Sequence, residues 1–179
     1  MIVGKSVILQ RYRSPCGEMM LGAIGDSICL CGWIGRSGYE RDLARVTKHF
    51  GACVVHGTCP VIDIAAEQLD EYFAGERKVF DLPLVFSGTE FQNMVWNGLL
   101  RIPYGVTISY GEEASRLGCP KSVRAVASAN GANPIGVIVP CHRVIGADGS
   151  LTGYSAGTDI KAFLLRLESI DLFLIAGKS

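Results

Sequence analysis

The chain has 179 residues, 49% of them hydrophobic, and its 17 Lys and Arg residues balance its 17 Asp and Glu residues. This length is enough for one large domain or two small ones, and the apolar content can build a core without disulfides or metal ions. A net charge of zero argues against nucleic-acid binding by the surface as a whole, because neutralising phosphates requires a local excess of Lys and Arg.

Cysteine usage and hydropathy indicate the compartment. Seven Cys is an odd number without the spacing of a secreted disulfide scaffold, and residues 1–5 lack the long apolar core of a signal peptide. No apolar run approaches the roughly 18 residues needed to cross a membrane. We therefore expect a cytoplasmic protein with reduced thiols and no membrane partner, associated with the nucleoid, or nuclear if eukaryotic.

The charges are distributed unevenly along the chain. Residues 1–90 carry nine Lys and Arg against eleven Asp and Glu, whereas residues 91–147 carry five against two. A modest basic surface is therefore expected on the second half alone.

Three apolar runs near the N-terminus predict strands at residues 7–12, 19–24 and 28–33. Turn-forming residues separate them at 14–17 and 25–27. Short turns join antiparallel neighbours, so the pattern predicts a three-stranded meander.

Two helices and a further strand should follow the meander. Apolar residues at helical spacing predict a helix over residues 39–50, which Gly51 can end. Residues 53–56 form a candidate strand, and residues 62–73 read as a second helix. We expect an α/β N-terminal domain over residues 1–80, with helices packed on an antiparallel sheet.

Four soft metal ligands lie within eleven positions: His49, Cys53, His56 and Cys59. Cys53 and His56 are an odd number of positions apart and would face opposite sides of a strand, whereas zinc needs ligands that converge. The sequence therefore favours no metal, although it leaves open whether these four residues bind one. It favours no cofactor either, since its 22 glycines form no Gly-x-Gly-x-x-Gly.

After a linker at residues 81–90, the chain reads as a mostly α C-terminal domain over residues 91–179. Thr89 followed by Gln92 fits a capping box, which predicts a helix that ends before Pro103.

Two short helices are expected next. Ser109 followed by Glu112 fits a second capping box and opens a helix that stops at Gly118. Pro120 then begins a helix over residues 121–130. Two short helices joined by so tight a turn form a candidate helix-turn-helix.

The second of these helices has a smooth surface of small residues and one long cation, Arg124. Small residues let a backbone approach the minor groove of DNA, and a single Arg could fill the space left by a flipped nucleotide. The alternative is an Ala-rich helix packed into a core, with Arg124 solvated at its end.

The chain is most distinctive where an apolar, largely β-branched run at residues 135–139 ends at Pro140 and Cys141. The run predicts a short buried strand, and Pro140 cannot continue its hydrogen bonds. Cys141 would then lie at the edge of the core, shielded on one side and reachable on the other, as suits a nucleophile. The alternative is a buried, inert Cys. In an extended chain His142 would point away from Cys141 and act on it through a water.

A last helix is expected near the C-terminus. Thr158 can cap it, apolar residues recur at helical spacing over residues 160–167, and Glu168 lies at its end. Before the Cys141 motif, Asn133 precedes Pro134 and predicts a turn.

These motifs resemble the O6-alkylguanine-DNA alkyltransferase family. Pro-Cys-His-Arg-Val at residues 140–144 is similar to that family's active-site motif. Further matches follow the same order: Phe-Gln at 91–92, Ile-Pro-Tyr-Gly at 102–105, Ser-Tyr at 109–110 and Gly-Tyr-Ser-Ala-Gly at 153–157. The resemblance is dense from about residue 82 to residue 168.

The resemblance implies a ribonuclease-H-like N-terminal domain and a helix-turn-helix in the C-terminal domain. It also implies DNA repair by irreversible, single-turnover transfer of the alkyl group of O6-alkylguanine, and of O4-alkylthymine, in duplex DNA to Cys141. The protein would bind the minor groove, flip the damaged base and act as a monomer without a cofactor. Alkyl-size preference stays open, because Ala156 stands where some members have Gly.

The family's functional residues match positions of this chain. His142, oriented by Glu168, would activate Cys141 through a water, and Tyr110 would protonate the departing guanine. The residues implied in DNA binding are Arg124, Lys121, Ser122, Ala125 and Ala129, and those implied in the substrate pocket are Asn133, Val144, Tyr154, Ser155 and Ala156.

Two other functions stay open. An alkyltransferase-like protein would flip alkylated bases without reacting, which requires Cys141 to be inert. A Cys–His acyl hydrolase would turn over esters or amides without binding DNA.

Overall fold

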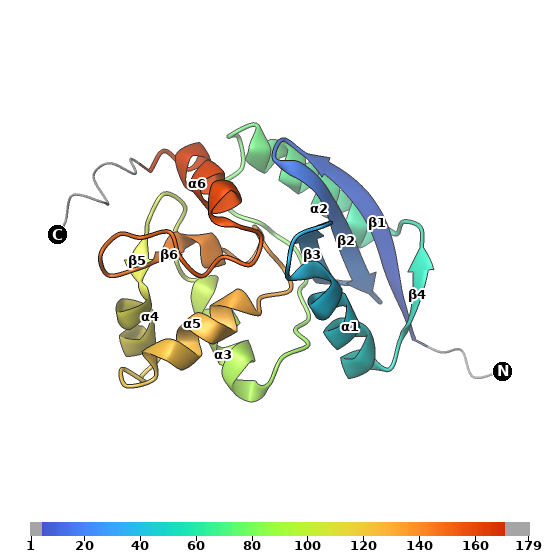
Figure 1. Cartoon of the computed structure of the whole chain (residues 1–179). Helices are drawn as coiled ribbons and strands as arrows, with labels where there is room; N and C mark the ends of the chain where they lie inside the picture. Colours follow the sequence, from blue (N-terminus) through green and yellow to red (C-terminus); the bar gives the residue numbers. More distant parts are fainter. Residues whose placement is uncertain (1–4, 171–179) are drawn as a thin grey trace. The chain divides into compact units, whose positions relative to one another are not determined.

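The computed structural model describes residues 5–170 and divides the chain into two units (Figure 1). Unit 1 comprises residues up to Ser87 together with Pro134–Ile138, and unit 2 comprises Gly88–Asn133 and the chain from Val139 onward. The expected division left residues 134–138 in the second domain, whereas here they return to the first unit. The linker expected at 81–90 contains the boundary at Ser87.

Unit 1 is built on a four-stranded sheet in the order β3-β2-β1-β4. Strands β1 (Ser6–Ser14), β2 (Gly17–Ile24) and β3 (Ser27–Trp33) pair antiparallel, which confirms the meander expected from the turn-forming residues between them. β4 (Cys53–His56) is the candidate fourth strand, and it pairs parallel to β1 with all four residues exposed.

Close packing requires a glycine in the middle of β2. A Cβ on Gly22 would lie 2.8 Å from Cβ of Leu30 and 3.0 Å from Cδ2 of Leu9, and the register of β2 and β3 shifts directly after it. Since real side chains do not approach that closely, any other residue would push the strands apart.

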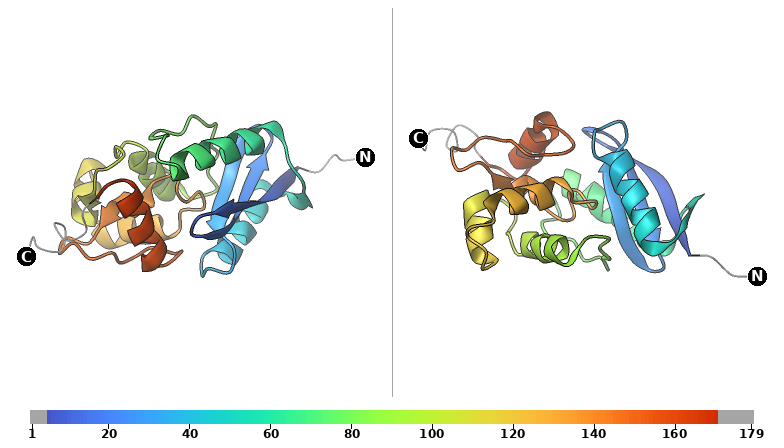
Figure 2. Two further views of the ribbon diagram at one scale, coloured as in Figure 1. Left: turned by 90° about the horizontal axis from the view of Figure 1, so that it is seen from above. Right: turned by 60° about the horizontal axis from the view of Figure 1, so that its bottom comes forward.

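The two helices of unit 1 cover opposite faces of the sheet, as the two views of Figure 2 show. On one face α1 (Tyr39–Phe50) packs Tyr39 and Val46 onto Val7 and Leu9 of β1. α2 (Pro60–Phe73) lies on the other face, toward which Tyr12 of β1 points because alternate residues of a strand face opposite sides of the sheet. There Tyr12 Oη donates a hydrogen bond of 2.7 Å to Asp70 of α2. Both helices confirm the predictions made from the helical spacing of apolar residues.

The apolar run at residues 135–139 is not a strand, so that prediction was wrong. Ile135 makes one isolated bridge to Cys31 of β3, and the chain then turns through Val137. Val137 has a φ of 67°, in the left-handed region that a β-branched residue adopts at a cost of about 1–3 kcal/mol. The run is apolar because its side chains are buried, not because the backbone is extended.

Unit 2 is mostly helical. Its helices are α3 (Glu90–Leu99), α4 (Tyr110–Arg116), α5 (Val123–Gly131) and α6 (Thr158–Leu167), with a short 3-10 helix η1 (Cys141–Arg143). Two short parallel strands, β5 (Ile108–Ser109) and β6 (Val144–Ile145), pair before α4 and after η1. Within residues 5–170 no helix is long and apolar enough to span a membrane.

Side-chain capping explains the starts of α3 and α4 in unit 2. Thr89 and Gln92 form both hydrogen bonds of a capping box, and the Ser109 hydroxyl accepts from the Glu112 N–H at 3.1 Å. Thr158 was expected to cap α6, but Gly157 holds that position and makes no side-chain bond, so Thr158 is the first helical residue. α6 thus begins one residue earlier than expected, whereas α5 begins later than expected, at Val123.

Candidate active site

Cys141 begins η1 in unit 2. Its side chain is 7% exposed, and its Sγ accepts a hydrogen bond from Nδ2 of Asn133 at 3.2 Å. The same Asn133 amide donates to the carbonyl of Val139 at 2.9 Å, which fixes its direction. Through these two hydrogen bonds Asn133 ties the chain after α5 to the cysteine.

Burial controls the acidity of this thiol. It raises the pKa of Cys141 to about 11, while the hydrogen bond from Asn133 and the Lys161 ammonium act in the opposite direction. A thiol with so high a pKa is protonated at neutral pH. The nucleophilic thiolate therefore needs a base that removes the proton during the reaction.

His142 leaves the backbone in a different direction from Cys141, although not for the expected reason. Cys141–Arg143 form a 3-10 turn, in which successive side chains point about 120° apart, whereas an extended chain was expected. The His142 side chain is completely buried, and its Nε2 lies 2.8 Å from Oε1 of Glu168.

This contact sets the protonation state of His142. Burial lowers the pKa of His142, and the charges of Arg143 and Lys161 act in the same direction against Glu168. A neutral ring beside a carboxylate donates through Nε2–H, which leaves the lone pair on Nδ1. Nδ1 is buried without a hydrogen-bond partner among residues 5–170, so it is a base available for proton transfer.

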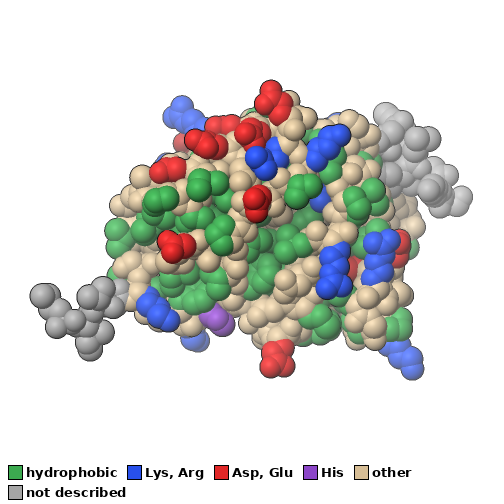
Figure 3. All heavy atoms as spheres, turned by 180° about the vertical axis from the view of Figure 1, so that it is seen from behind, with side chains coloured by type: hydrophobic (Ala, Val, Ile, Leu, Met, Phe, Trp, Pro, Cys, Tyr) green, Lys and Arg blue, Asp and Glu red, His purple; other side chains and the backbone are tan. Residues whose placement is uncertain are grey.

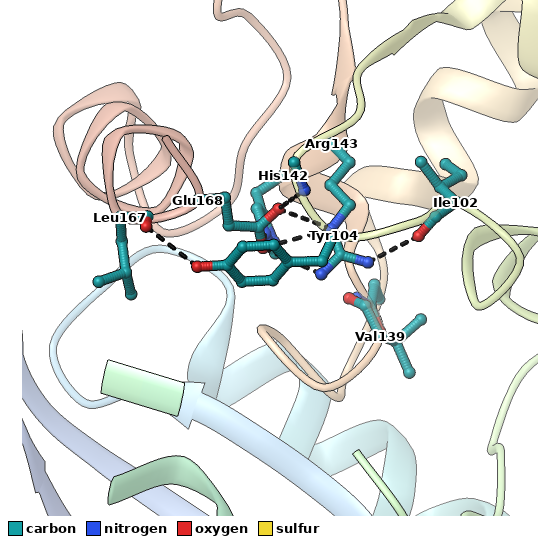
Figure 4. A network of polar contacts seen from close by, with 9 residues as sticks. Ile102, Tyr104, Val139, His142, Arg143, Leu167 and Glu168 are labelled. Atoms are coloured by element: carbon teal, nitrogen blue, oxygen red, sulfur yellow. Dashed lines mark hydrogen bonds and ion pairs between the residues drawn. The ribbon is translucent and has the colours of Figure 1, made fainter. Parts of the chain in front are cut away.

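The carboxylate of Glu168 contacts both His142 and Arg143 (Figure 4). Nε of Arg143 donates to its Oε2 at 2.9 Å and Nη2 to its Oε1 at 3.0 Å, and the backbone N–H of Gly105 donates to Oε2 at 3.0 Å. Burial would raise the pKa of Glu168, but the hydrogen bonds from His142 and Arg143 outweigh it and hold that pKa well below its usual range. Glu168 therefore stays charged.

Arg143 was not among the predicted functional residues, although it lies inside the matching motif. Its Nη1 donates to the carbonyl of Ile102 at 2.6 Å, and its guanidinium carbon lies 5.8 Å from the ring centre of Tyr104. The Tyr104 hydroxyl donates to the carbonyl of Leu167 at 3.0 Å. These contacts tie the Ile102–Gly105 stretch to the end of α6 and fix the carboxylate that orients His142 (Figure 4).

Tyr110 opens α4 on another side of the same site. Its hydroxyl donates to the carbonyl of Thr152 at 2.9 Å. Burial raises the pKa of Tyr110 to about 12, and the charges of Cys141 and Glu113 add to the shift. A Cβ on Gly153 would lie 2.5 Å from the Tyr110 hydroxyl, so glycine is required there. Tyr110 is therefore a neutral phenol that can act as a proton donor.

Lys161 is a functional candidate that sequence reasoning missed. Its side chain is completely buried on α6, and Nζ donates to the carbonyls of Val144 at 2.6 Å and Thr152 at 3.0 Å. Burial lowers the pKa of Lys161 to about 8, against the charge of Cys141. Lys161 lies among the buried apolar residues of α6, next to Ile160, and a Lys in such a stripe is the sequence feature that indicates a buried charge.

The residues predicted to bind DNA differ in exposure. Lys121, Arg124 and Ala125 are exposed, and Ser122 is half-buried. Ala129 is 3% exposed, and its carbonyl accepts from Nε1 of buried Trp96 at 2.8 Å. Lys121, Arg124 and Ala125 thus lie on the surface, whereas Ala129 joins α5 to α3.

The predicted pocket residues lie around β6 and the loop before α6. The Val144 carbonyl is held by Lys161, Ala156 is buried, and Tyr154 and Ser155 are half-buried.

The four possible metal ligands in unit 1 are not gathered. Cys53 Sγ lies 3.4 Å from the Ser6 hydroxyl, and the His49 ring contacts Phe50 edge to face. Among residues 5–170, no group of three or more His, Cys, Asp or Glu side chains is placed to hold a metal ion.

Relatives of known activity match this chain. Residues 90–170 match the family model of the 6-O-methylguanine DNA methyltransferase, DNA binding domain. A methylated-DNA–protein-cysteine methyltransferase of Methanosarcina acetivorans is 62% identical over 104 residues, covering 58% of this chain and 67% of that protein. The constitutive enzyme of the same name from Bacillus subtilis is 54% identical over 116 residues, covering 64% of this chain and 70% of that protein.

Solved structures match over nearly the whole chain. The crystal structure of Mycobacterium tuberculosis O6-methylguanine methyltransferase has a TM-score of 0.78 at 42% identity and covers 94% of this chain and 98% of its own. Mycobacterium tuberculosis OGT in complex with DNA has a TM-score of 0.76 at 39% identity, with 95% and 98% covered. The chain belongs to the methylated-DNA–protein-cysteine methyltransferases, a family of DNA-repair enzymes.

Proposed function

We propose that this protein repairs duplex DNA by moving the alkyl group of O6-alkylguanine onto Sγ of Cys141, once per molecule. The observation that carries the proposal is a buried thiol followed in the chain by a buried, neutral imidazole, one nitrogen of which is held by a charged carboxylate. A base for the thiol and a fixed direction for that base are what alkyl transfer to sulfur requires.

The first step is removal of the thiol proton. Nδ1 of His142 accepts it through a bridging water, because it is the one ring nitrogen not bound to Glu168. The imidazolium that forms is stabilised by Glu168, and the ammonium of Lys161 stabilises the Cys141 thiolate. Arg143 keeps the carboxylate in place throughout.

The second step is displacement at the saturated alkyl carbon. The bond from Sγ of Cys141 to that carbon forms while the bond from the carbon to O6 breaks, and the electron pair passes into the purine. Tyr110 gives its proton to the ring system as this charge develops, which lowers the barrier only in the transition state. The product is a thioether, which has no ready leaving group, so each molecule reacts once.

Binding to DNA is proposed to use α4 and α5 as a helix-turn-helix, with the small residues of α5 against the minor groove. Support comes from the exposed Lys121, Arg124 and Ala125 and from the DNA complex of the Mycobacterium tuberculosis relative. Arg124 would occupy the space left when the damaged base is flipped out. The Ser155 N–H and the Val144 carbonyl would then bind the flipped base, with Tyr154 and Ala156 beside it.

Several finer assignments belong to the same proposal. Unit 1 is a ribonuclease-H-like domain, as its strand order and parallel fourth strand support. The protein acts as a monomer in the cytoplasm, or in the nucleus of a eukaryote, where thiols stay reduced. O4-alkylthymine is a second substrate, because its alkyl carbon is equally saturated and bound to an exocyclic oxygen of the base.

Mass spectrometry of the protein after mixing with excess O6-methylguanine duplex tests the proposal. We expect the peptide carrying Cys141 to gain about one CH2, since a methyl group replaces the thiol proton. Cys141→Ala should gain no mass yet bind the duplex. Cys119→Ala, which removes a half-buried thiol outside the site, should react like the wild type.

Each competing function predicts a different result. Binding without a mass change would assign the protein to the non-reacting alkyltransferase-like class. Continued turnover of an ester or amide without DNA binding would assign it to the acyl hydrolases. Continued turnover of methylated DNA would contradict the single-use mechanism.

A further inference from the structure

Glu113 is a buried acidic residue that the reaction described above does not use. It lies on α4 one turn after Tyr110, its side chain is 2% exposed, and its Oε2 accepts a hydrogen bond from Nδ2 of Asn130 at 2.6 Å. Asn130 lies near the end of α5, is 3% exposed, and stands three residues before Asn133, which donates to Cys141.

Among residues 5–170, the Glu113–Asn130 pair leaves one oxygen on each side chain without a hydrogen bond. In the part of the chain that the structure describes, Oε1 of Glu113 and Oδ1 of Asn130 are both buried without a hydrogen bond. Each is the second oxygen of a group whose other polar atom is already bound to the partner side chain. Two buried acceptors without donors cost free energy, and an ionised carboxylate offers no proton to share between them.

One added proton removes both defects. A carboxylic acid has an O–H group that can donate to the amide oxygen while its other oxygen accepts from the amide N–H. We propose that Glu113 and Asn130 form a carboxylic acid–amide pair between α4 and α5, held by two hydrogen bonds while Glu113 is protonated. Loss of this proton opposes thiolate formation at Cys141 and so lowers the rate of alkyl transfer.

The surroundings of Glu113 support a neutral acid. Burial raises its pKa to about 7, and the Asn130 hydrogen bond offsets only part of the shift. α4 packs against α5, β5 and β6, and the one charged side chain on those three elements is Arg124, which is exposed. No described cation is paired with Glu113, so ionisation leaves a negative charge in the core of unit 2.

That charge acts on the two reactive side chains of the site. Ionised Glu113 raises the pKa of Cys141 and the pKa of Tyr110. Deprotonation therefore opposes thiolate formation at Cys141 and makes Tyr110 a weaker acid, and both changes slow the transfer. This consequence rests on the proposed function, whereas the acid–amide pair itself does not. Glu113 is thus a positioning residue whose effect depends on pH.

Glu113→Gln is the informative variant, because its side-chain amide can donate to Oδ1 and accept from Nδ2 of Asn130 at every pH. Glu112→Gln is the matched control on the same helix, since Glu112 is exposed and paired with Arg116. Both variants remove one carboxylate by the same chemical change.

Carboxyl NMR of protein carrying 13C-labelled glutamate tests the pair directly. We expect one signal, absent from Glu113→Gln and present in Glu112→Gln, to titrate with a midpoint near pH 7. A midpoint below pH 5 for that signal would show an ionised Glu113 at neutral pH and overturn the acid–amide pair.

The melting temperature gives an independent readout. A raised folded-state pKa means that the folded protein binds the proton more tightly, so the contribution of Glu113 to stability is full below pH 4.5 and is lost as the pH rises to about 7. The melting temperature of the wild type should therefore fall relative to that of Glu113→Gln between pH 5 and pH 8. A difference that does not change with pH would contradict the proposal.

The rate of alkyl transfer tests the link to Cys141. The ratio of the wild-type rate to the Glu113→Gln rate should be near one at pH 6 and fall severalfold by pH 8.5, while Glu112→Gln follows the wild type. A constant ratio would remove Glu113 from the control of Cys141. Absence of transfer by all three proteins at every pH would instead overturn the proposed function, and the NMR titration would still decide the pair.

Discussion

Unit 2 buries three charged side chains, Arg143, Lys161 and Glu168, and each forms hydrogen bonds with a group that stabilises its charge. Glu168 accepts from Arg143, and Lys161 donates to two carbonyls. Buried charges are tolerated when they are paired, but removing one partner leaves the other uncompensated. The arrangement that orients His142 is therefore also a major determinant of the stability of unit 2.

Glu168→Gln should lower the free energy of unfolding by about 3–5 kcal/mol, because it leaves the Arg143 charge buried without a counter-ion. Urea denaturation at pH 7 measures this loss. Glu112→Gln breaks the exposed pair with Arg116 and should cost less than about 1 kcal/mol. Equal costs for the two variants would show that burial of the Glu168 pair does not matter.

The same variant has a pH signature. The pKa of Glu168 is held below its unfolded value, so its contribution to stability is present above about pH 4.5 and is lost as the pH falls further. The stability gap between wild type and Glu168→Gln should therefore narrow below pH 4. A gap that widens on acidification would contradict the depressed pKa.

Tyr110→Phe should slow alkyl transfer at least tenfold, about 1.4 kcal/mol, because the hydroxyl is proposed to act on charge that appears only as the bond to O6 breaks. DNA affinity should stay nearly unchanged. Loss of the bond from Tyr110 to the Thr152 carbonyl should cost about 1 kcal/mol of stability.

Single-turnover rates, DNA affinity and urea denaturation, measured together, separate these effects for Tyr110. An unchanged transfer rate would remove Tyr110 from the mechanism. A larger loss of stability with an unchanged rate would make its hydroxyl structural.

At the scale of the elements, local chemistry decided what the sequence could predict. The meander, α1 and α3 were predictable because their turns, apolar spacing and caps lie within a few residues of each other. The bounds of α5 and α6 were off by one or two residues because their N-caps make no side-chain bond.

The stretch around residues 135–139 shows where sequence reasoning fails. A buried turn and a buried strand have the same apolar composition, and the left-handed φ of Val137 is imposed by tertiary contacts. Cys141 and His142 were found through their motif, whereas the partners of Lys161 and Glu113 come from distant segments. Such long-range hydrogen bonds have no local pattern.

The exposed start of α5 has a prediction of its own. Arg124→Ala should slow repair of duplex DNA much more than reaction with free O6-methylguanine base, because the proposed flipping of a nucleotide concerns the duplex alone. Arg101→Ala removes an exposed cation near the end of α3 and should affect neither substrate strongly. Equal losses on both substrates by Arg124→Ala would make Arg124 structural.

The charge of the whole molecule limits how it can bind DNA. The net charge is zero, and on the face that Figure 3 shows, side chains of both signs lie among apolar ones. A protein without a general positive potential gains affinity from a few local phosphate contacts. Binding should therefore depend on salt, but less steeply than for a strongly basic protein.

The slope of log affinity against log salt concentration reports the number of those phosphate contacts. With about three phosphate contacts the affinity should fall roughly 40-fold between 50 and 200 mM salt, since each contact contributes about 0.9 to the slope of log affinity against log salt. Lys121, in the turn before α5, is exposed and is expected to make one of them.

Lys121→Ala should reduce the slope by about 0.9 and weaken binding to all sequences alike, because a phosphate contact carries no base information. Fluorescence anisotropy of a labelled duplex at five salt concentrations measures this change. Lys48→Ala removes an exposed Lys from α1 of unit 1 and should leave the slope unchanged. A slope that stays the same in Lys121→Ala, or falls equally in Lys48→Ala, would place the phosphate contacts elsewhere than the start of α5.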